Sequence, residues 1–215
     1  MESIKLYVAN SGGALNNHLD KIGRAFQRAV SVVSVKLFLT QVDVICANDP
    51  YGTIQALGIG GYAPNRHLAY LYLDGLKELD ENEIFYTLCH ELHHTRRYDG
   101  PGYGQTLFDS FIFEGLATAF EEAMSEGGTY LSTLLQQRTK TPKLIKETSK
   151  YFDDKDFDHR TWFITDKTKK LPSLAGYEIG FYIVRNYLAL NNQTAADLVL
   201  TPTDIFHKFF LDTMK

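Results

Sequence analysis

Three of the seven histidines in the chain lie within five residues, in the segment His90-Glu91-Leu92-His93-His94. Residues four positions apart on an α-helix lie about 40° apart on one face and one turn apart in height, so His90 and His94 can share one metal ion. Zinc binds neutral imidazole, and a catalytic zinc site combines three protein ligands with an open position for water. Glu91 lies about 100° round from His90, where its carboxylate can take a proton from that water. The spacing predicts a Zn²⁺ site with His90 and His94 as ligands and Glu91 as the catalytic base.

A random origin of this pattern is improbable on composition. In a chain of 215 residues with seven histidines, about 0.01 matches to the pattern arise by chance. The other reading, two histidines on a solvated helix face, is disfavoured because the chain continues directly into a second apolar helix.

The third ligand is expected on that second helix. Glu114 follows His94 by 114 − 94 = 20 residues and interrupts the apolar stretch FIFEGLATAF. A carboxylate in such surroundings is costly unless it is paired or bound to a metal. Gly100 stands six residues after His94, where a third ligand histidine would lie in another class of zinc peptidase. Glu114 is therefore predicted as the third ligand, and Asp99 and Asp109 are the poorer alternatives.

Apolar periodicity independently places the motif on a helix. Ile84, Leu88 and Leu92 repeat at intervals of four, after Asp80 as a potential N-cap, which indicates a helix from there to about Arg97. The helix that carries Glu114 is expected over about 105–126. The other expected elements are helices over 14–30, 130–138 and 173–190 and from 201, strands over 33–46 and 67–74, and a loop over 49–65. Strands come early and helices late, which is typical of an α+β fold.

Composition limits the function classes. The chain has 44% hydrophobic residues and a net charge of −4, so it can bury a core but has no basic excess for nucleic acid or an anionic membrane. No apolar run approaches the roughly 20 residues of a membrane span, and residues 1–10 lack the features of a signal peptide. Two cysteines, Cys46 and Cys89, make no disulfide framework, and Cys89 is expected in the core. We expect a cytoplasmic protein with one domain, 1–215, made of an N-terminal lobe of about 1–98 and a helical lobe of about 99–215.

The motif pair resembles a known class of enzyme. HExxH followed after nineteen residues by Glu114-Gly115-Leu116-Ala117 is similar to the gluzincin peptidases, which include thermolysin-like enzymes and zinc aminopeptidases. Together with the later GYEIGFYIV, it also resembles a bacterial family of short predicted zinc-dependent proteases, mainly over 60–126 and 174–188. The resemblance implies a zincin-like fold, with an N-terminal mixed sheet, an active-site helix and a helical C-terminal lobe.

The resemblance also implies further roles. In zinc aminopeptidases a tyrosine three residues before a glycine stabilises the oxyanion, and Tyr177 has this spacing to Gly180; Tyr182 is the reserve. Thermolysin-like enzymes orient a ligand histidine with an aspartate at the position that Thr118 occupies here. The group that orients the ligands is thus open, with Ser110 and Thr118 as candidates.

His93 is expected to have a structural role, and a hydrogen bond to one of the ligands is the less favoured alternative. Zincins usually bind substrate along an edge strand. The strand over 67–74, preceded by Gly60, is the candidate, although an interior position is equally open. The expected substrate contacts are Gly61, Tyr62, Leu68 and Tyr70.

The sequence thus predicts a zinc-dependent peptidase that acts on a peptide or small protein. No motif for gripping a free amine precedes the metal helix, which favours an endopeptidase. Two alternatives stay open: a non-catalytic zinc-binding interaction module and a zinc hydrolase that acts on a non-peptide substrate.

Overall fold

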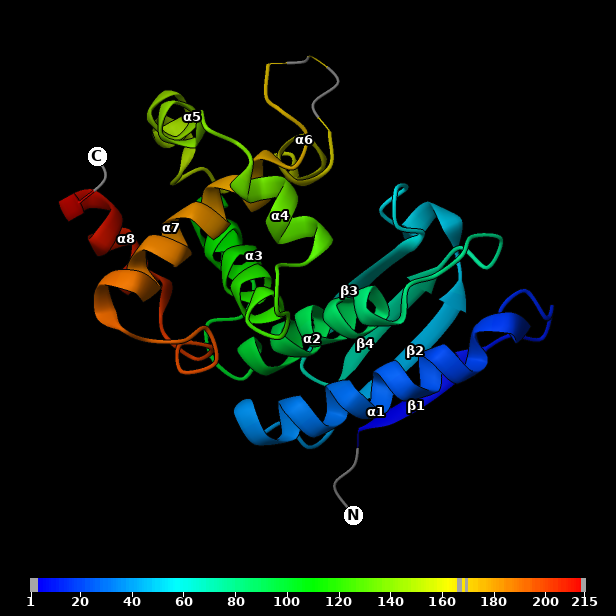
Figure 1. The fold of residues 1–215 in the computed structure, drawn as a ribbon. Coiled ribbons are helices and arrows are strands. Elements are labelled where there is room, and N and C mark those ends of the chain that lie inside the picture. The colour runs from blue at the N-terminus through cyan, green and yellow to red at the C-terminus, as the bar shows by residue number, and fades with distance from the viewer. Residues whose placement is uncertain (1–3, 166–167, 169, 214–215) are drawn as a thin grey trace.

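The computed structural model describes residues 4–165, 168 and 170–213 as an α+β fold, as the sequence predicts. The strands are β1 (Lys5–Ala9), β2 (Asp43–Asn48), β3 (Ile59–Asn65) and β4 (Leu68–Leu73). The helices are α1 (Leu19–Lys36), α2 (Glu81–Arg97), α3 (Leu107–Glu122), α4 (Tyr130–Gln136), α5 (Thr141–Thr148), α6 (His159–Phe163), α7 (Ala175–Asn191) and α8 (Thr203–Thr213), with 3-10 turns at Asn16–His18, Pro50–Gly52 and Ser149–Tyr151. Figure 1 shows the sheet with α1 and α2 in one half of the molecule and the later helices in the other.

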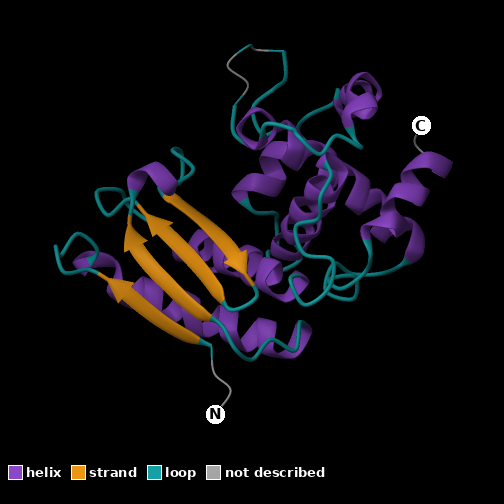
Figure 2. Cartoon of the chain, turned by 180° about the vertical axis from the view of Figure 1, so that it is seen from behind, coloured by secondary structure: helices purple, strands orange, loops and turns teal. Residues whose placement is uncertain are grey.

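The sheet is mixed, in the order β1-β2-β4-β3. Strands β1, β2 and β4 are parallel, and β3 runs antiparallel to β4. Helices α1 and α2 cover one face and leave the other open (Figure 2). Alternate residues of the central strands point under these helices and are buried, namely Val44, Cys46, Ala69, Leu71 and Leu73. This face supports α2, and α2 carries the histidine motif.

The expected strand over 33–46 is wrong in its first part. Helix α1 continues to Lys36, and the strand begins only at Asp43. Ala29 and Val33 extend the buried stripe of α1 at helical spacing, and the backbone N–H of Leu37 donates to the carbonyl of Val33. Burial of this stripe outweighs the weak preference of β-branched residues for strands.

The expected loop over 49–65 contains β3, and β1 and the helices α5 and α6 were not anticipated. The glycines of β3 look like loop residues but serve close packing. A Cβ at Gly60 would lie 2.2 Å from the carbonyl oxygen of Gly52, and one at Gly61 would lie 2.4 Å from Cγ of Glu91. Glycine here admits neighbours to the strand backbone, which composition alone does not distinguish from a turn.

Helix α3 is the core of the second half. Nearly every residue from Leu107 to Glu121 is buried, and α7 packs across it. A Cβ at Gly115 would lie 2.4 Å from the backbone of Gly180, and one at Gly180 would lie 1.9 Å from the carbonyl oxygen of Phe111. The two helices therefore touch backbone to backbone, which brings the side chains of α7 close to Glu114.

Two side chains of α2 hold the segment between α7 and α8. His93 is fully buried, and its Nε2 donates to the carbonyl of Ala195 (3.4 Å). Arg97 is also fully buried and donates to the carbonyls of Val199 (2.9 Å) and Thr201 (3.2 Å). Burial lowers the pKa of Arg97 to about 10, so the guanidinium remains charged at neutral pH. These contacts join the two halves behind the motif.

Among the described residues, no helix combines the length and apolar character needed to cross a membrane.

The contact between α3 and α7 makes a stability prediction. Replacing Gly180 by alanine is expected to lower the free energy of unfolding by about 3 kcal/mol, because the new methyl group forces the helices apart. Thermal or urea denaturation followed by circular dichroism measures the change. Gly23→Ala is the matched control, because a Cβ there meets no atom within 4 Å. It should raise stability by about 0.5–1 kcal/mol. A Gly180→Ala protein as stable as this control would contradict the close contact.

Candidate metal centre

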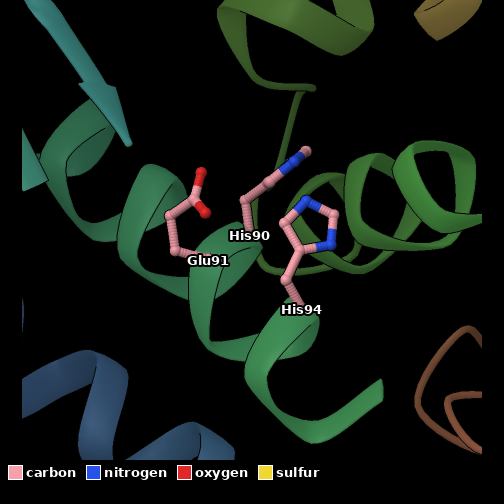
Figure 3. A group of neighbouring side chains, drawn as sticks. All are labelled: His90, Glu91 and His94. Atoms are coloured by element: carbon pink, nitrogen blue, oxygen red, sulfur yellow. The ribbon is translucent and has the colours of Figure 1, made fainter. Parts of the chain in front are cut away.

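Helix α2 presents the two motif histidines to α3. The carboxylate of Asp80 caps its first turn by accepting from the N–H groups of Asn82 (2.7 Å) and Glu83 (3.1 Å). The apolar row that contains Leu88 is buried against the core. His90 lies two residues after Leu88, so it and His94 lie on roughly the opposite side of the helix. Their ring centroids are 4.6 Å apart, and the rings are nearly perpendicular. Figure 3 shows both rings side by side, with the Glu91 carboxylate next to them.

Glu114 of α3 reaches both histidines. Its Oε2 lies 3.1 Å from Nε2 of His90 and 3.3 Å from Nε2 of His94. In a tetrahedral zinc site with bonds of 2.0–2.1 Å, neighbouring ligand atoms are about 3.3 Å apart. Both distances from Oε2 of Glu114 are therefore those expected between ligands of one zinc ion.

Glu91 is the other nearby carboxylate. His90, Glu91 and His94 each offer a ligand atom, and these atoms lie within 4.8 Å of one another. Glu114 is the carboxylate that contacts both ring nitrogens directly, whereas Glu91 lies towards the sheet.

The charges of the three residues match a site for a cation. Burial lowers the pKa of His94 to about 4, so its imidazole is neutral. Burial disfavours the charge on Glu114, but His94 and His90 hold the pKa of this carboxyl well below its usual range. Burial also opposes the charge on His90, yet hydrogen bonds to Glu114 and Glu121 raise its pKa well above the usual value. A proton on His90 thus neutralises acidic groups that a metal ion would neutralise in its place.

Glu121 is a site residue that sequence reasoning missed. Its Oε2 accepts a hydrogen bond from Nδ1 of His90 (2.9 Å), and this bond leaves Nε2 for a metal. Glu121 is seven residues after Glu114 and so returns to the same face of α3 after two turns. This helical spacing could have identified Glu121 from the sequence. The resemblance to thermolysin-like enzymes pointed instead to Thr118, four residues after Glu114.

Neither expected candidate for orienting the ligands does so. Thr118 is buried, and its hydroxyl has no hydrogen-bond partner among the described residues. The hydroxyl of Ser110 donates to the carbonyl of Thr106 (3.3 Å). The alternatives to Glu114 are also engaged elsewhere: Asp99 pairs with arginines at the surface, and Asp109 forms the capping box of α3 with Thr106.

Glu91 is held against the edge of the sheet. A Cβ at Gly61 would lie 2.4 Å from Cγ of Glu91, so this glycine leaves room for the side chain, and the nearby backbone of Ala63 favours its charged form. Burial raises the pKa of Glu91 to about 8, with a further contribution from Glu114. Its Oε2 is buried and has no hydrogen-bond partner among the described residues. Glu91 is thus a carboxyl group that can exchange a proton near neutral pH.

The edge strand next to the motif is β3. Of the two positions left open for the strand over 67–74, the interior one is confirmed and the edge one is wrong, because β4 pairs with β2 on one side and β3 on the other. The main-chain groups of Leu68 and Tyr70 therefore belong to the sheet. Gly61 and Tyr62 lie on β3, and Tyr62 is 56% exposed. An isolated bridge joins Ile54 to Ile59 at the start of β3, and no strand of the described chain covers the rest of its outer side.

Tyr177 is the residue of α7 that faces the site. Its ring centroid lies 6.4 Å from that of His90. Burial and the carboxylates of Glu114 and Glu91 raise the pKa of Tyr177 well above its usual value, so the phenol keeps its proton. Tyr182 instead lines a groove on another side of α7, together with Pro142 and Phe209.

The predictions that Cys89 lies in the core and that His93 is a structural histidine are confirmed. Cys89 is fully buried in the core. His93 is buried against Phe120, with ring centroids 5.4 Å apart, and its hydrogen bond leads away from the other histidines.

Removal of the Glu121 carboxylate tests its role. The two carboxylate oxygens of Glu121 accept separately from Nδ1 of His90 and from the hydroxyl of Thr129. In Glu121→Gln only one oxygen remains to accept, so zinc affinity is expected to fall about 10- to 100-fold. Competition with a chromophoric chelator measures the affinity. Glu122→Gln, one residue on and directed towards Arg185 and Gln136, should bind zinc as the unaltered protein does. Equal affinities of the two variants would remove Glu121 from the site.

Comparison with known proteins assigns the chain to a family. No curated protein and no solved structure is significantly similar to the chain. Residues 17–208 match a protein family described as "Predicted Zn-dependent protease" (DUF2268). This match covers most of the 215 residues, including the histidine motif, Glu114 and Tyr177. The chain therefore belongs to this family of predicted zinc-dependent proteases.

Proposed function

We propose that the protein is a gluzincin-like zinc endopeptidase that hydrolyses peptide bonds in peptides or small proteins. The observation that carries the proposal is the convergence of Glu114 Oε2 on Nε2 of both His90 and His94, with the free Glu91 carboxyl beside them. His90, His94 and Glu114 would hold the ion. A zinc ion bound there supplies Lewis acidity, which lowers the pKa of a coordinated water towards about 7 and polarises a carbonyl.

Glu91 is the proton carrier. Its side chain packs against Gly61 of β3, and Oε2, which has no hydrogen-bond partner among the described residues, is the atom that accepts a proton from the attacking water. The same carboxyl group then delivers the proton to the amine of the departing fragment. A pKa near neutrality suits a group that must both accept and release a proton.

Tyr177 and β3 act on the substrate. The protonated phenol of Tyr177 donates a hydrogen bond to the oxygen that becomes negative when the carbonyl is attacked. The uncovered side of β3 offers main-chain groups to an extended peptide, as in β-augmentation. Gly61 and Tyr62 would contact this peptide. Leu68 and Tyr70 lie one strand further in, so their contribution would be confined to side chains on the open face.

The alternatives are a structural zinc module and a hydrolase for a non-peptide substrate. A structural zinc would use a fourth protein ligand, but Cys89 lies in the core and His93 is bonded to Ala195. The uncovered strand beside Glu91 favours an extended peptide over other substrates. Both cysteines are free and buried, which suits the reducing cytoplasm that we include in the proposal.

Glu91→Gln separates metal binding from chemistry. The amide has the size of the carboxyl group but cannot take up the proton, so hydrolysis is expected to fall about 10²- to 10⁴-fold while zinc stays bound. Metal analysis and digestion of a peptide library, with and without chelator, provide the two measurements. Glu147→Gln on the surface of α5 is the control. Stoichiometric zinc in the unaltered protein with no cleavage of any peptide would favour the binding module, and loss of zinc with full activity would contradict the role of Glu91.

Tyr177→Phe removes one hydroxyl group from the site. Because the hydroxyl acts on charge that develops only during attack, kcat is expected to fall about 10²- to 10³-fold with little change in KM. Steady-state kinetics on a peptide cleaved by the unaltered protein measure both constants. Tyr182→Phe, on another side of the same helix, should be fully active; the opposite pattern would exchange the two roles.

A further inference from the structure

Glu121 is itself held by a residue outside the zinc-binding helices. Thr129, the residue before α4, is buried, and its hydroxyl donates to Oε1 of Glu121 (2.7 Å). The other carboxylate oxygen of Glu121 accepts from His90. A continuous hydrogen-bonded path thus runs from the start of α4 through one carboxylate to a proposed zinc ligand.

The capping of α4 fixes the direction of the threonine hydroxyl. Oγ1 of Thr129 accepts a hydrogen bond from the N–H of Ser132 (3.2 Å), and Oγ of Ser132 accepts from the N–H of Thr129 (2.9 Å). The single proton of this hydroxyl has two acceptors within reach, Oγ of Ser132 (3.2 Å) and Oε1 of Glu121 (2.7 Å), and the shorter, charge-assisted bond to the carboxylate is the stronger one. Both oxygens of Glu121 then have donors, which restricts rotation of the carboxylate.

The turn after α3 places Thr129 beside Glu121. Gly128 has φ +93°, a backbone conformation that glycine adopts at little cost. Its N–H donates to Oγ of Ser125 (2.9 Å), which closes the turn. At the next residue, the N–H of Tyr130 donates to Oε1 of Glu83 on α2 (3.1 Å). The start of α4 is therefore hydrogen-bonded to both helices that carry the proposed ligands.

We infer that Thr129 is a positioning residue for the metal centre. Its hydroxyl orients Glu121, and Glu121 orients the imidazole of His90 so that Nε2 faces the ion. This inference rests on the proposed zinc site, and it extends the site to a segment that touches neither the ion nor the substrate.

The test compares two substitutions that break the same capping box. Thr129→Val removes the hydroxyl from both the cap and Glu121 at nearly constant volume. Ser132→Ala removes only the reciprocal half of the capping box, the bond from the N–H of Thr129 to Oγ of Ser132, and leaves the bond from Thr129 to Glu121 in place. Thr129→Ser restores the hydroxyl and serves as the rescue. The readouts are zinc affinity by chelator competition, the visible spectrum of the Co²⁺-substituted protein, and the melting temperature of the metal-free protein.

We expect Thr129→Val to weaken zinc binding about tenfold and to change the Co²⁺ spectrum. Ser132→Ala should lower the melting temperature to a smaller extent and bind zinc within about twofold of the unaltered protein, and Thr129→Ser should restore affinity. Equal losses of zinc affinity in the valine and alanine variants would show that Thr129 acts only by stabilising α4, and would overturn the inference. Unchanged affinity in Thr129→Val would also overturn it.

A further variant covers failure of the valine protein to fold. Thr129→Asp can cap α4 but, as a carboxylate, has no proton to donate to Glu121, so it should show the same loss of zinc affinity. Failure of the proposed function is distinguishable, because an unaltered protein that binds no zinc refutes the metal centre itself. An unaltered protein that binds zinc and cleaves peptides, with a Thr129→Val variant of equal affinity, refutes only the role of Thr129.

Discussion

The arrangement of the molecule depends on a carboxylate placed between two imidazoles in a buried position. Glu114, His90 and His94 are each less than a tenth exposed, and an unpaired charge at such a depth is strongly destabilising. Each therefore requires the others or a metal ion. This constraint requires α2 and α3 to cross at one particular height. It also explains why Glu121 and Thr129 are engaged in turn, since most buried polar groups are hydrogen-bonded.

The elements around the site lie close to it because glycines allow their backbones to approach. Glycines at the crossing of α3 and α7 let the backbones touch, which places Tyr177 beside His90. On the other side, Gly61 lets β3 lie against Glu91. The candidate site is therefore enclosed by an edge strand and a helix whose separations are set by the absence of side chains. This geometry gives Glu91 both a fixed position and a raised pKa.

Local signals were sufficient where chemistry and periodicity coincide on one helix. The cap at Asp80 and the apolar row predicted α2, and the spacing of His90 and His94 follows from the helical repeat alone. Glu114 was identifiable because a charge in an apolar run needs an explanation. The secondary-structure prediction was wrong where glycine or valine is compatible with two structures. The glycines of β3 are also typical of a loop, and the valines at the end of α1 are also typical of a strand. Glu121 was overlooked although its helical spacing to Glu114 placed it on the same face.

By itself, the sequence determined the helical positions of His90, Glu91, His94 and Glu114, because spacing along a helix specifies which side chains share a face. It did not determine which strand forms the edge of the sheet, which glycines separate helices, or that Thr129 contacts Glu121. Those features are relations between segments far apart in the chain or across a turn, and burial in three dimensions decides them. The order β1-β2-β4-β3 illustrates the difference, since each strand has a local pattern but its neighbours follow only from packing against α1 and α2.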